Sequence, residues 1–173
     1  MEQPTLQAPW RMEYIRSLRG DDPKDCFLCR AAAGSDPALR RERLLLWDTE
    51  LTIVLLNRFP YANGHLLVAP RLHKGEMEDL TDAEHLDLAL QTVAAQRLLK
   101  RAISAQGFNV GINIGRVAGA GLPGHLHQHV VPRWGGDINF MSVVGETKVI
   151  PQAIEQLYDE LVKVKGEMLN AEC

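Results

Sequence analysis

The stretch His125-Leu126-His127-Gln128-His129-Val130-Val131-Pro132 decides how the rest of the chain is interpreted. It holds three of the six histidines of the 173-residue sequence, at alternate positions. Side chains at positions i, i+2 and i+4 of a strand share one face, so a strand here predicts three imidazoles in a row. Near neutral pH an imidazole can act as nucleophile, proton carrier or metal ligand. The stretch therefore predicts a chemically active site on a β-sheet.

Three interpretations of these histidines compete. Hydrogen-bonded structural histidines suit an isolated residue such as His85 better than three in alternation, because each imidazole adds little apolar burial and needs a partner. Alternate histidines can also supply zinc ligands and leave one position for water, as in a zinc-dependent hydrolase. In the third interpretation, one imidazole attacks a phosphate ester or anhydride while its neighbours orient it. We favour this third interpretation.

A glycine-rich loop, residues 115–124, directly precedes the histidines. Residues without a Cβ let main-chain N–H groups approach phosphate oxygens closely. Glycine-rich turns are common between strands, and the dinucleotide-binding and P-loop patterns are absent from the sequence. Beside the histidines, however, the loop favours phosphate chemistry.

Short apolar runs separated by turn residues predict the strands. Asp48-Thr49-Glu50 divides the first two runs, and a turn-rich segment followed by Gly64 leads into a third that Pro70 ends. One further strand is expected on each side of the glycine-rich loop. The five predicted strands are residues 44–47, 51–56, 66–69, 108–114 and 125–131.

Helical signals lie between and after these strands. Thr81 and Glu84 have capping-box spacing and begin the main helix, which continues toward Gly107. A small helical turn is expected after Cys29. The apolar stripe of the main helix is predicted to be Leu86, Leu90, Val93, Ala94 and Leu98. The C-terminal helix is predicted from Pro151, Ile154, Leu157, Tyr158 and Leu161, with Gly166 beyond it.

These elements predict an α+β fold, with an antiparallel sheet of about five strands, one long helix and a C-terminal helix. Residues 1–24 are expected to form an N-terminal arm, and residues 25–173 a single domain. The net charge of −3 lacks the basic excess of a general nucleic-acid binder. The most apolar stretch, 51–56, is too short to cross a bilayer, and the N-terminus lacks a secretory pattern, so we expect a cytoplasmic protein without membrane or nucleic-acid partners.

Cys26 and Cys29 are two residues apart, and Cys173 is left over in any disulfide scheme. In a reducing compartment this spacing favours a metal or redox site, although two buried thiols are the alternative.

Together these features resemble the histidine-triad (HIT) family, over nearly the whole stretch from Cys26 to about Met141. The matching segments, besides the histidines and the paired cysteines, are 55–60, 64–68 and 109–113. The resemblance implies a HIT-like fold, a homodimer and cleavage of nucleotides through a nucleotidyl-histidine intermediate. It makes His127 the nucleophile, His129 a contact to the phosphate or leaving group, His125 an orienting residue and His65 a support for the triad.

The resemblance also implies how a nucleotide is bound. Adenosine is expected near Phe27 and Leu55, its ribose at Asn57, and its α-phosphate at Asn113 and at loop amides such as those of Gly119 and Gly121. Zinc-containing relatives use positions that correspond here to a set of four residues. These implied ligands of a structural zinc are Cys26, Cys29, His73 and His125. No catalytic cofactor is expected.

Two departures from the family pattern affect the site. Gln128 is polar where the family has a hydrophobic residue, and Gly119–Gly124 replaces a common Gly-Gln-Ser/Thr segment. We therefore expect main-chain N–H groups, in place of the missing side chains, to bind the phosphate, and the phosphate pocket to be wider.

The triad stretch together with the residues that follow it, 125–141, resembles the dinucleoside-polyphosphate branch, particularly bacterial diadenosine tetraphosphate phosphorylases. In that branch inorganic phosphate resolves the intermediate, giving ADP and ATP. The alternatives are a nucleotide hydrolase or phosphoramidase of the same family, the zinc-dependent hydrolase, and a non-catalytic nucleotide-binding protein.

Overall fold

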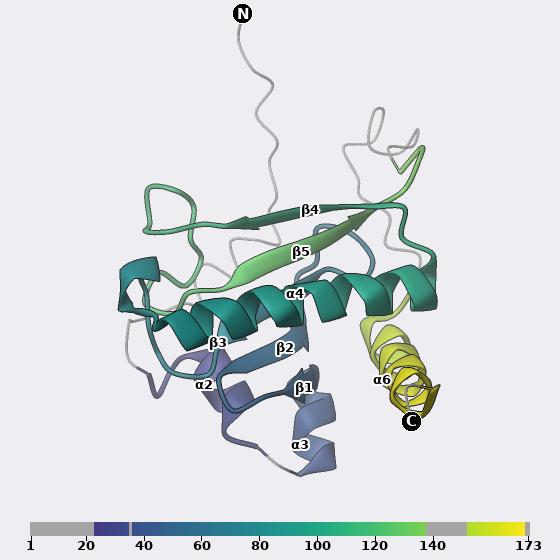
Figure 1. The fold of residues 1–173 in the computed structure, drawn as a ribbon, viewed down its shortest axis with the longest axis horizontal. Coiled ribbons are helices and arrows are strands. Elements are labelled where there is room, and N and C mark those ends of the chain that lie inside the picture. The colour runs from purple at the N-terminus through teal and green to yellow at the C-terminus, as the bar shows by residue number, and fades with distance from the viewer. Residues whose placement is uncertain (1–22, 35, 138–151, 172–173) are drawn as a thin grey trace, which may run out of the picture.

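The structure is a computed structural model that describes residues 23–34, 36–137 and 152–171. The expected N-terminal arm, except for its last two residues, lies outside the described residues, as do Pro151 and the segment 138–141. Figure 1 shows the arrangement of the helices and strands. In chain order they are α2 (Phe27–Ala32), α3 (Pro37–Glu42), β1 (Leu45–Asp48), β2 (Thr52–Leu56), β3 (Leu66–Pro70), the short 3-10 helix η1 (Met77–Asp79), α4 (Asp82–Ile103), β4 (Gly107–Ile112), β5 (Gln128–Arg133) and α6 (Ile154–Ala171).

The five strands form one antiparallel sheet in the order β1-β2-β3-β5-β4. Strand β3 therefore pairs with β5 rather than with β4, and the chain reaches β4 through the long helix α4. Figure 1 shows α4 lying across one face of the sheet, where it contacts β2, β3 and β5. This architecture confirms the predicted α+β class, the antiparallel sheet and the two expected helices.

The central strands β2 and β3 are buried along their whole length because both faces of the sheet are covered. On one face, Val54 and Val68 pack with residues of α4 and α6. On the other face, Ile53 and Leu67 pack with residues of α2 and with Leu122. This explains why these two strands read as continuous apolar runs in the sequence rather than as an alternation.

Helix α4 begins as predicted at a capping box of Thr81 and Glu84, but it presents a different face to the sheet. Leu86 and Leu90, which the sequence predicted to be buried, are 62% and 55% exposed, and Val93 is also exposed. The buried positions of α4 are Glu84, Leu88, Thr92, Ala95, Leu98 and Leu99, so Leu98 is the one residue of the predicted stripe among them. The helix has apolar residues on more than one side, so its sequence did not identify the side that packs.

Two other helices differ from expectation. Helix α3 was not predicted; Asp36 caps it and Pro37 occupies its first position, a pattern typical of a helix start. Helix α6 continues through Gly166 to Ala171, although Gly166 was expected to lie beyond its end. Its predicted core residues Leu157 and Leu161 are buried. Within the described part of the chain, no helix is long and apolar enough to cross a bilayer.

Strand β5 starts at Gln128, so two of the three alternating histidines precede it. Gln128 forms the outermost residue pair with each neighbouring strand, opposite Val68 of β3 and Ile112 of β4. Before that point the chain turns toward another segment, because the N–H of Leu126 donates to the carbonyl of Lys74 at 2.6 Å. The prediction of three imidazoles along one strand was therefore wrong, and the two outer histidines have different surroundings.

Candidate active site and metal centre

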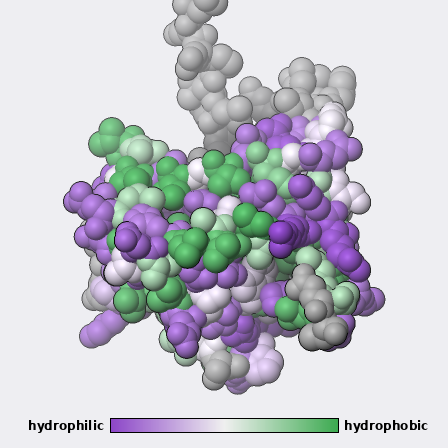
Figure 2. Space-filling view, in the orientation of Figure 1, coloured by the Kyte–Doolittle hydropathy of each residue, from purple (hydrophilic) through white to green (hydrophobic). Residues whose placement is uncertain are grey.

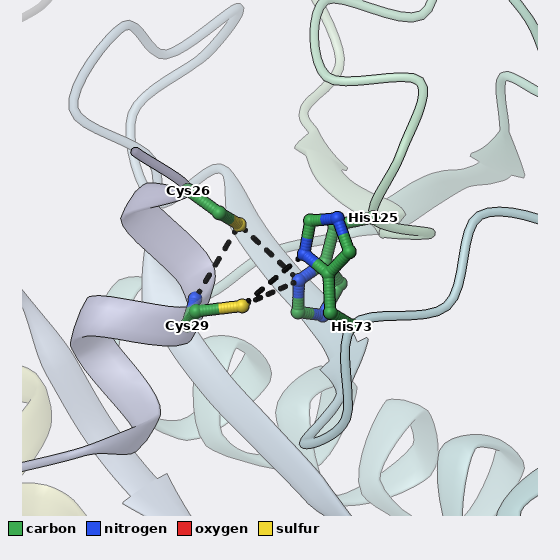
Figure 3. Close-up of side chains that lie close together, drawn as sticks. All are labelled: Cys26, Cys29, His73 and His125. Carbon is green, nitrogen blue, oxygen red and sulfur yellow. Dashed lines mark hydrogen bonds between the residues drawn. The ribbon is translucent and has the colours of Figure 1, made fainter. Parts of the chain in front are cut away.

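Four side chains that the sequence assigned to a metal come together between α2 and the segment that precedes β5. They are Cys26, Cys29, His73 and His125, whose ligand atoms all lie within 4.8 Å of one another. Figure 3 shows both cysteines at the start of α2 facing the two imidazoles. His125 Nδ1 lies 3.2 Å from Cys26 Sγ, and His73 Nδ1 lies 3.2 Å from Cys29 Sγ.

The donor set and its spacing fit a tetrahedral cation such as zinc. Bonds of about 2.3 Å to sulfur and about 2.0 Å to nitrogen place neighbouring ligand atoms roughly 3.5 Å apart. His125 Nε2–H donates to the carbonyl of Pro70 at 2.8 Å, which leaves Nδ1 as the atom with a lone pair toward the sulfurs. Burial and Cys26 raise the pKa of the Cys29 thiol to about 12. A bound cation would be needed to hold the Cys29 sulfur as a thiolate.

His127 is buried next to this cluster, with 3% of its surface exposed. Its Nδ1 lies 2.9 Å from the main-chain carbonyl oxygen of His125. A carbonyl oxygen only accepts, so Nδ1 of His127 carries the hydrogen and Nε2 of the neutral ring carries the lone pair. Burial lowers the pKa of His127, which keeps the ring neutral at physiological pH. His127 thus has the tautomer and charge of a nucleophile.

A hydrogen bond between two imidazoles joins His65 to His129, and we call these two residues the imidazole chain. The N–H of Tyr61 donates to Nδ1 of His65 at 3.0 Å, so the hydrogen of neutral His65 is on Nε2. That Nε2 lies 3.0 Å from Nδ1 of His129, which accepts the hydrogen bond and leaves the hydrogen of His129 on its own Nε2. The rings of His127 and His129 are 5.1 Å apart. The arrangement places the lone pair of the His127 ring beside a ring with an N–H donor.

Tyr61 is a member of this site that the sequence reasoning missed. Its ring stacks on His65 with centroids 4.8 Å apart, and its backbone determines the tautomer of that histidine. Asn57, expected at the ribose, also contacts this chain, because its Nδ2–H group lies 3.2 Å from His65 Nδ1. Its Oδ1 accepts from the N–H of Phe59. In the sequence, the only signal for Tyr61 was an aromatic residue in the turn before His65.

Of the other residues expected at the nucleotide, Leu55 and Phe27 lie on the side of the sheet that α2 covers. Leu55 is buried in the core beneath α2, and Phe27 is partly buried against that core. Asn113 directly follows Ile112, which pairs with Gln128 next to His127. In the glycine-rich loop, the N–H of Gly119 donates to the carbonyl of Arg116, so this amide is engaged within the loop. Gly121 is partly buried one residue before the buried Leu122.

Gln128 lies on the opposite face of β5 from its two histidine neighbours. Its Nε2–H group donates to the hydroxyl of Thr92 on α4 at 2.7 Å, and that hydroxyl donates to the carbonyl of Leu88. The polar residue at this position therefore has a buried polar partner on the long helix. This explains the first departure from the family pattern.

Fold and site together define an α+β domain with a buried neutral histidine, a neighbouring imidazole chain and a four-residue cluster suited to a metal ion. A family model for the HIT domain matches residues 40–136. The chain belongs to the HIT domain family.

Similar proteins agree with this family. AP-4-A phosphorylase of Mycobacterium tuberculosis is 42% identical over 86% of this chain and 77% of the relative. The asymmetrical bis(5'-nucleosyl)-tetraphosphatase of Schizosaccharomyces pombe is 28% identical over 86% of this chain and 69% of the relative. The crystal structure of a zinc-bound histidine triad family protein from Mycobacterium smegmatis superposes with a TM-score of 0.68 at 25% identity, covering 87% of this chain and 99% of that one.

Proposed function

We propose that this protein is a nucleotidyltransferase that cleaves dinucleoside polyphosphates, with His127 as the nucleophile. The observation that carries the proposal is the bond from His127 Nδ1–H to the carbonyl of His125, which leaves the lone pair of the neutral ring on Nε2. In the first step Nε2 attacks the α-phosphorus, an N–P bond forms, and the bond to the bridging oxygen breaks. The electron pair leaves with the polyphosphate chain.

The residues around His127 support both steps of the reaction. The carbonyl of His125 accepts from Nδ1–H and stabilises the positive charge that the ring acquires when it is nucleotidylated. His129 Nε2–H donates to a phosphoryl or leaving oxygen, and His65 keeps His129 in that tautomer. In the second step an acceptor attacks the phosphorus, and the N–P electron pair returns to Nε2.

We propose diadenosine tetraphosphate as the substrate and inorganic phosphate as the acceptor, which gives ATP in the first step and ADP in the second. The names of the relatives from Mycobacterium tuberculosis and Schizosaccharomyces pombe support the substrate class, and the first supports the acceptor. Adenosine binds near Phe27 and Leu55, with Asn57 at the ribose and Asn113, with the amide of Gly121, at the phosphate; the amide of Gly119 is bonded within the loop. The reducing cytoplasm suits two cysteines that are free thiols in the structure.

The four-residue cluster holds a structural zinc in this proposal. The fit of the donors and the zinc-bound relative of known structure support the choice of metal. A bound zinc supplies a cross-link between α2 and the segment before β5. The chain's own contribution is that His125, held at Nδ1 by the cluster and at Nε2 by Pro70, offers its carbonyl to His127.

We also propose that residues 25–173 act as one domain and that two copies form a homodimer. Strand β4 ends the sheet, and within the described residues it has β5 as its single neighbour. Val110 on β4 is 44% exposed, and Leu86, Leu90 and Val93 are exposed on α4. Figure 2 shows hydrophobic surface over α4 and along β4 on the same face. A second copy that covers this face would remove an open sheet edge.

Product analysis tests the proposed activity. The purified protein is incubated with diadenosine tetraphosphate with and without inorganic phosphate, beside His127→Ala. We expect phosphate-dependent ADP and ATP from the wild type, and a loss of more than about 10⁴-fold in the variant because the nucleophile is gone. His85→Ala, a histidine on α4 outside the cluster, is the control and is expected to keep full activity.

Other outcomes of this experiment separate the alternatives. AMP and ATP formed without phosphate would identify a hydrolase that uses the same histidines. AMP binding without turnover of any nucleotide would identify a binding protein. Full activity of His127→Ala would reject the proposed nucleophile.

A further inference from the structure

Lys74 and Glu84 form a partly buried ion pair next to the histidine cluster, in which the Lys74 side chain is 21% exposed. Glu84 is 4% exposed, and its two carboxylate oxygens lie 2.8 and 2.7 Å from Nζ of Lys74. The N–H and the hydroxyl of Thr81 donate to the same carboxylate at 2.7 and 2.9 Å. A capping box needs only the contacts with Thr81, so Lys74 is a partner that the start of α4 does not require.

The main chain of Lys74 connects this ion pair to the triad. Its carbonyl accepts from the N–H of Leu126 at 2.6 Å, and Leu126 lies between His125 and His127. The next residue, Gly75, packs against the chain just before them, because a Cβ there would lie 2.9 Å from the carbonyl oxygen of Pro123. The segment that carries Lys74 thus supports the triad segment backbone to backbone.

We propose that Lys74 and Glu84 are a positioning pair that fixes the imidazole of His127 through Leu126. The proposal rests on the proposed function, in which His127 is the nucleophile. Helix α4 is the rigid element, Glu84 at its first turn holds the Lys74 side chain, and the Lys74 carbonyl holds the residue before His127. A partly buried ion pair is a poor source of stability compared with apolar packing, but its geometry is directional. Directional support suits a nucleophile, since small displacements in an active site slow the reaction strongly.

Three variants test the pair in the full-length protein: Lys74→Met, Glu84→Gln and the double variant. Glutamine keeps the capping contact with Thr81 and removes the charge that Lys74 needs. The control is Arg41→Gln with Asp159→Asn, which removes an exposed ion pair of similar length, 2.8 Å, between α3 and α6. The measurements are the single-turnover rate of His127 labelling by diadenosine tetraphosphate, the Kd for AMP, and the free energy of unfolding in urea.

We expect each single variant to slow labelling by at least about 10-fold, because the attacking nitrogen is displaced, with the Kd for AMP changed less than about 2-fold. The double variant no longer buries an unpaired charge, so its stability is expected to recover toward wild type while labelling stays slow. The control is expected to label at the wild-type rate. Labelling that recovers with stability in the double variant, or that is normal in the single variants, would overturn the proposal.

A second measurement keeps this inference separate from the proposed function. The imidazole ¹⁵N resonances of His127 report its tautomer in the free protein, without any substrate. In the wild type we expect the Nδ1–H form, and in Lys74→Met a mixture of both tautomers. An unchanged His127 signal in that variant would reject the positioning role. If the wild type is not labelled at His127, the proposed function fails, and the resonances still decide whether the pair positions this ring.

Discussion

At the scale of single residues, Gln128 shows how a polar residue is accommodated between two histidines. Its side chain points away from the triad and donates to the Thr92 hydroxyl, which in turn donates to the carbonyl of Leu88. The sequence identified Gln128 as unusual but not its partner, because Thr92 is distant along the chain. The pair links the first residue of β5 to the middle of α4.

This pair predicts a non-additive effect on stability. Thr92→Val removes the acceptor of the Gln128 amide and is expected to lower the free energy of unfolding by about 1–3 kcal/mol. Adding Gln128→Leu removes the unsatisfied donor, so the double variant is expected to regain at least half of that loss. Urea unfolding of the wild type, both single variants and the double variant measures the coupling. Additive losses would show that the two side chains do not act together.

At the scale of secondary structure, the capping box of α4 predicts a dependence on pH. Hydrogen bonding to Lys74 and Thr81 lowers the pKa of Glu84 to about 2 from its usual 4.5. A lowered pKa stabilises the folded state above the unfolded value and loses that contribution as the pH falls through the folded value. The difference in unfolding free energy between wild type and Glu84→Gln is therefore expected to be constant above about pH 5.5 and to shrink toward pH 2. Urea titrations at a series of pH values measure it; a difference independent of pH would contradict the assigned partner.

The elements also show what the sequence could and could not predict. Strands β2 and β3 were predictable because continuous apolar runs need two covered faces, and α6 because Leu157, Tyr158 and Leu161 share one side. The packing face of α4 was not predictable from the sequence. Leu86 and Leu88 are equally apolar, and only contact with the sheet determines which of them is buried. The start of β5 depends on a contact with Lys74 that has no local signal.

In the candidate site, too, residue identities were predictable and contacts with distant segments were not. The resemblance pointed to the four residues that form the cysteine and histidine cluster and to the other histidines, because these residue types are rare and their spacing is distinctive. The tautomers, by contrast, depend on main-chain groups of Tyr61, Pro70 and His125, and the main chain is invisible to residue identity. The sequence thus named most of the side chains that the structure brings together, though not Tyr61, and the structure supplied how each is oriented.

At the scale of the whole molecule, the exposed face formed by β4 and α4 predicts the oligomeric state. The proposed homodimer has twice the 19.3 kDa of one chain. Leu90→Lys together with Val110→Lys places two charges on this face and is expected to give a monomer, since lysine on an edge strand opposes pairing. Val162→Lys, at an exposed apolar residue of α6, is the control and is expected to leave the dimer intact. Light scattering after gel filtration measures the mass, and a monomeric wild type would contradict the proposal.

The metal cluster connects stability of the whole molecule to its chemistry. Its residues come from α2, the segment after β3 and the segment before β5, which are far apart in sequence, so the proposed zinc would cross-link α2 to the segment that carries His127. His73→Ala removes a ligand outside the triad. It is expected to lower the zinc content from one atom per chain to almost none. The thermal midpoint is expected to fall by roughly 10 °C, at about 2–4 °C per kcal/mol for a chain of this size.

The order in which structure and activity are lost tells a structural zinc from a catalytic one. With a structural zinc, chelator treatment loosens the support of His125 and His127, so activity is expected to decline in step with the thermal midpoint. A zinc that activates water would instead be removed with loss of all activity while the protein stays folded. Zinc content by mass spectrometry, thermal unfolding and product formation are therefore followed on the same samples during chelation. Complete inactivation at an unchanged midpoint would reject the histidine nucleophile in favour of a metal-bound hydroxide.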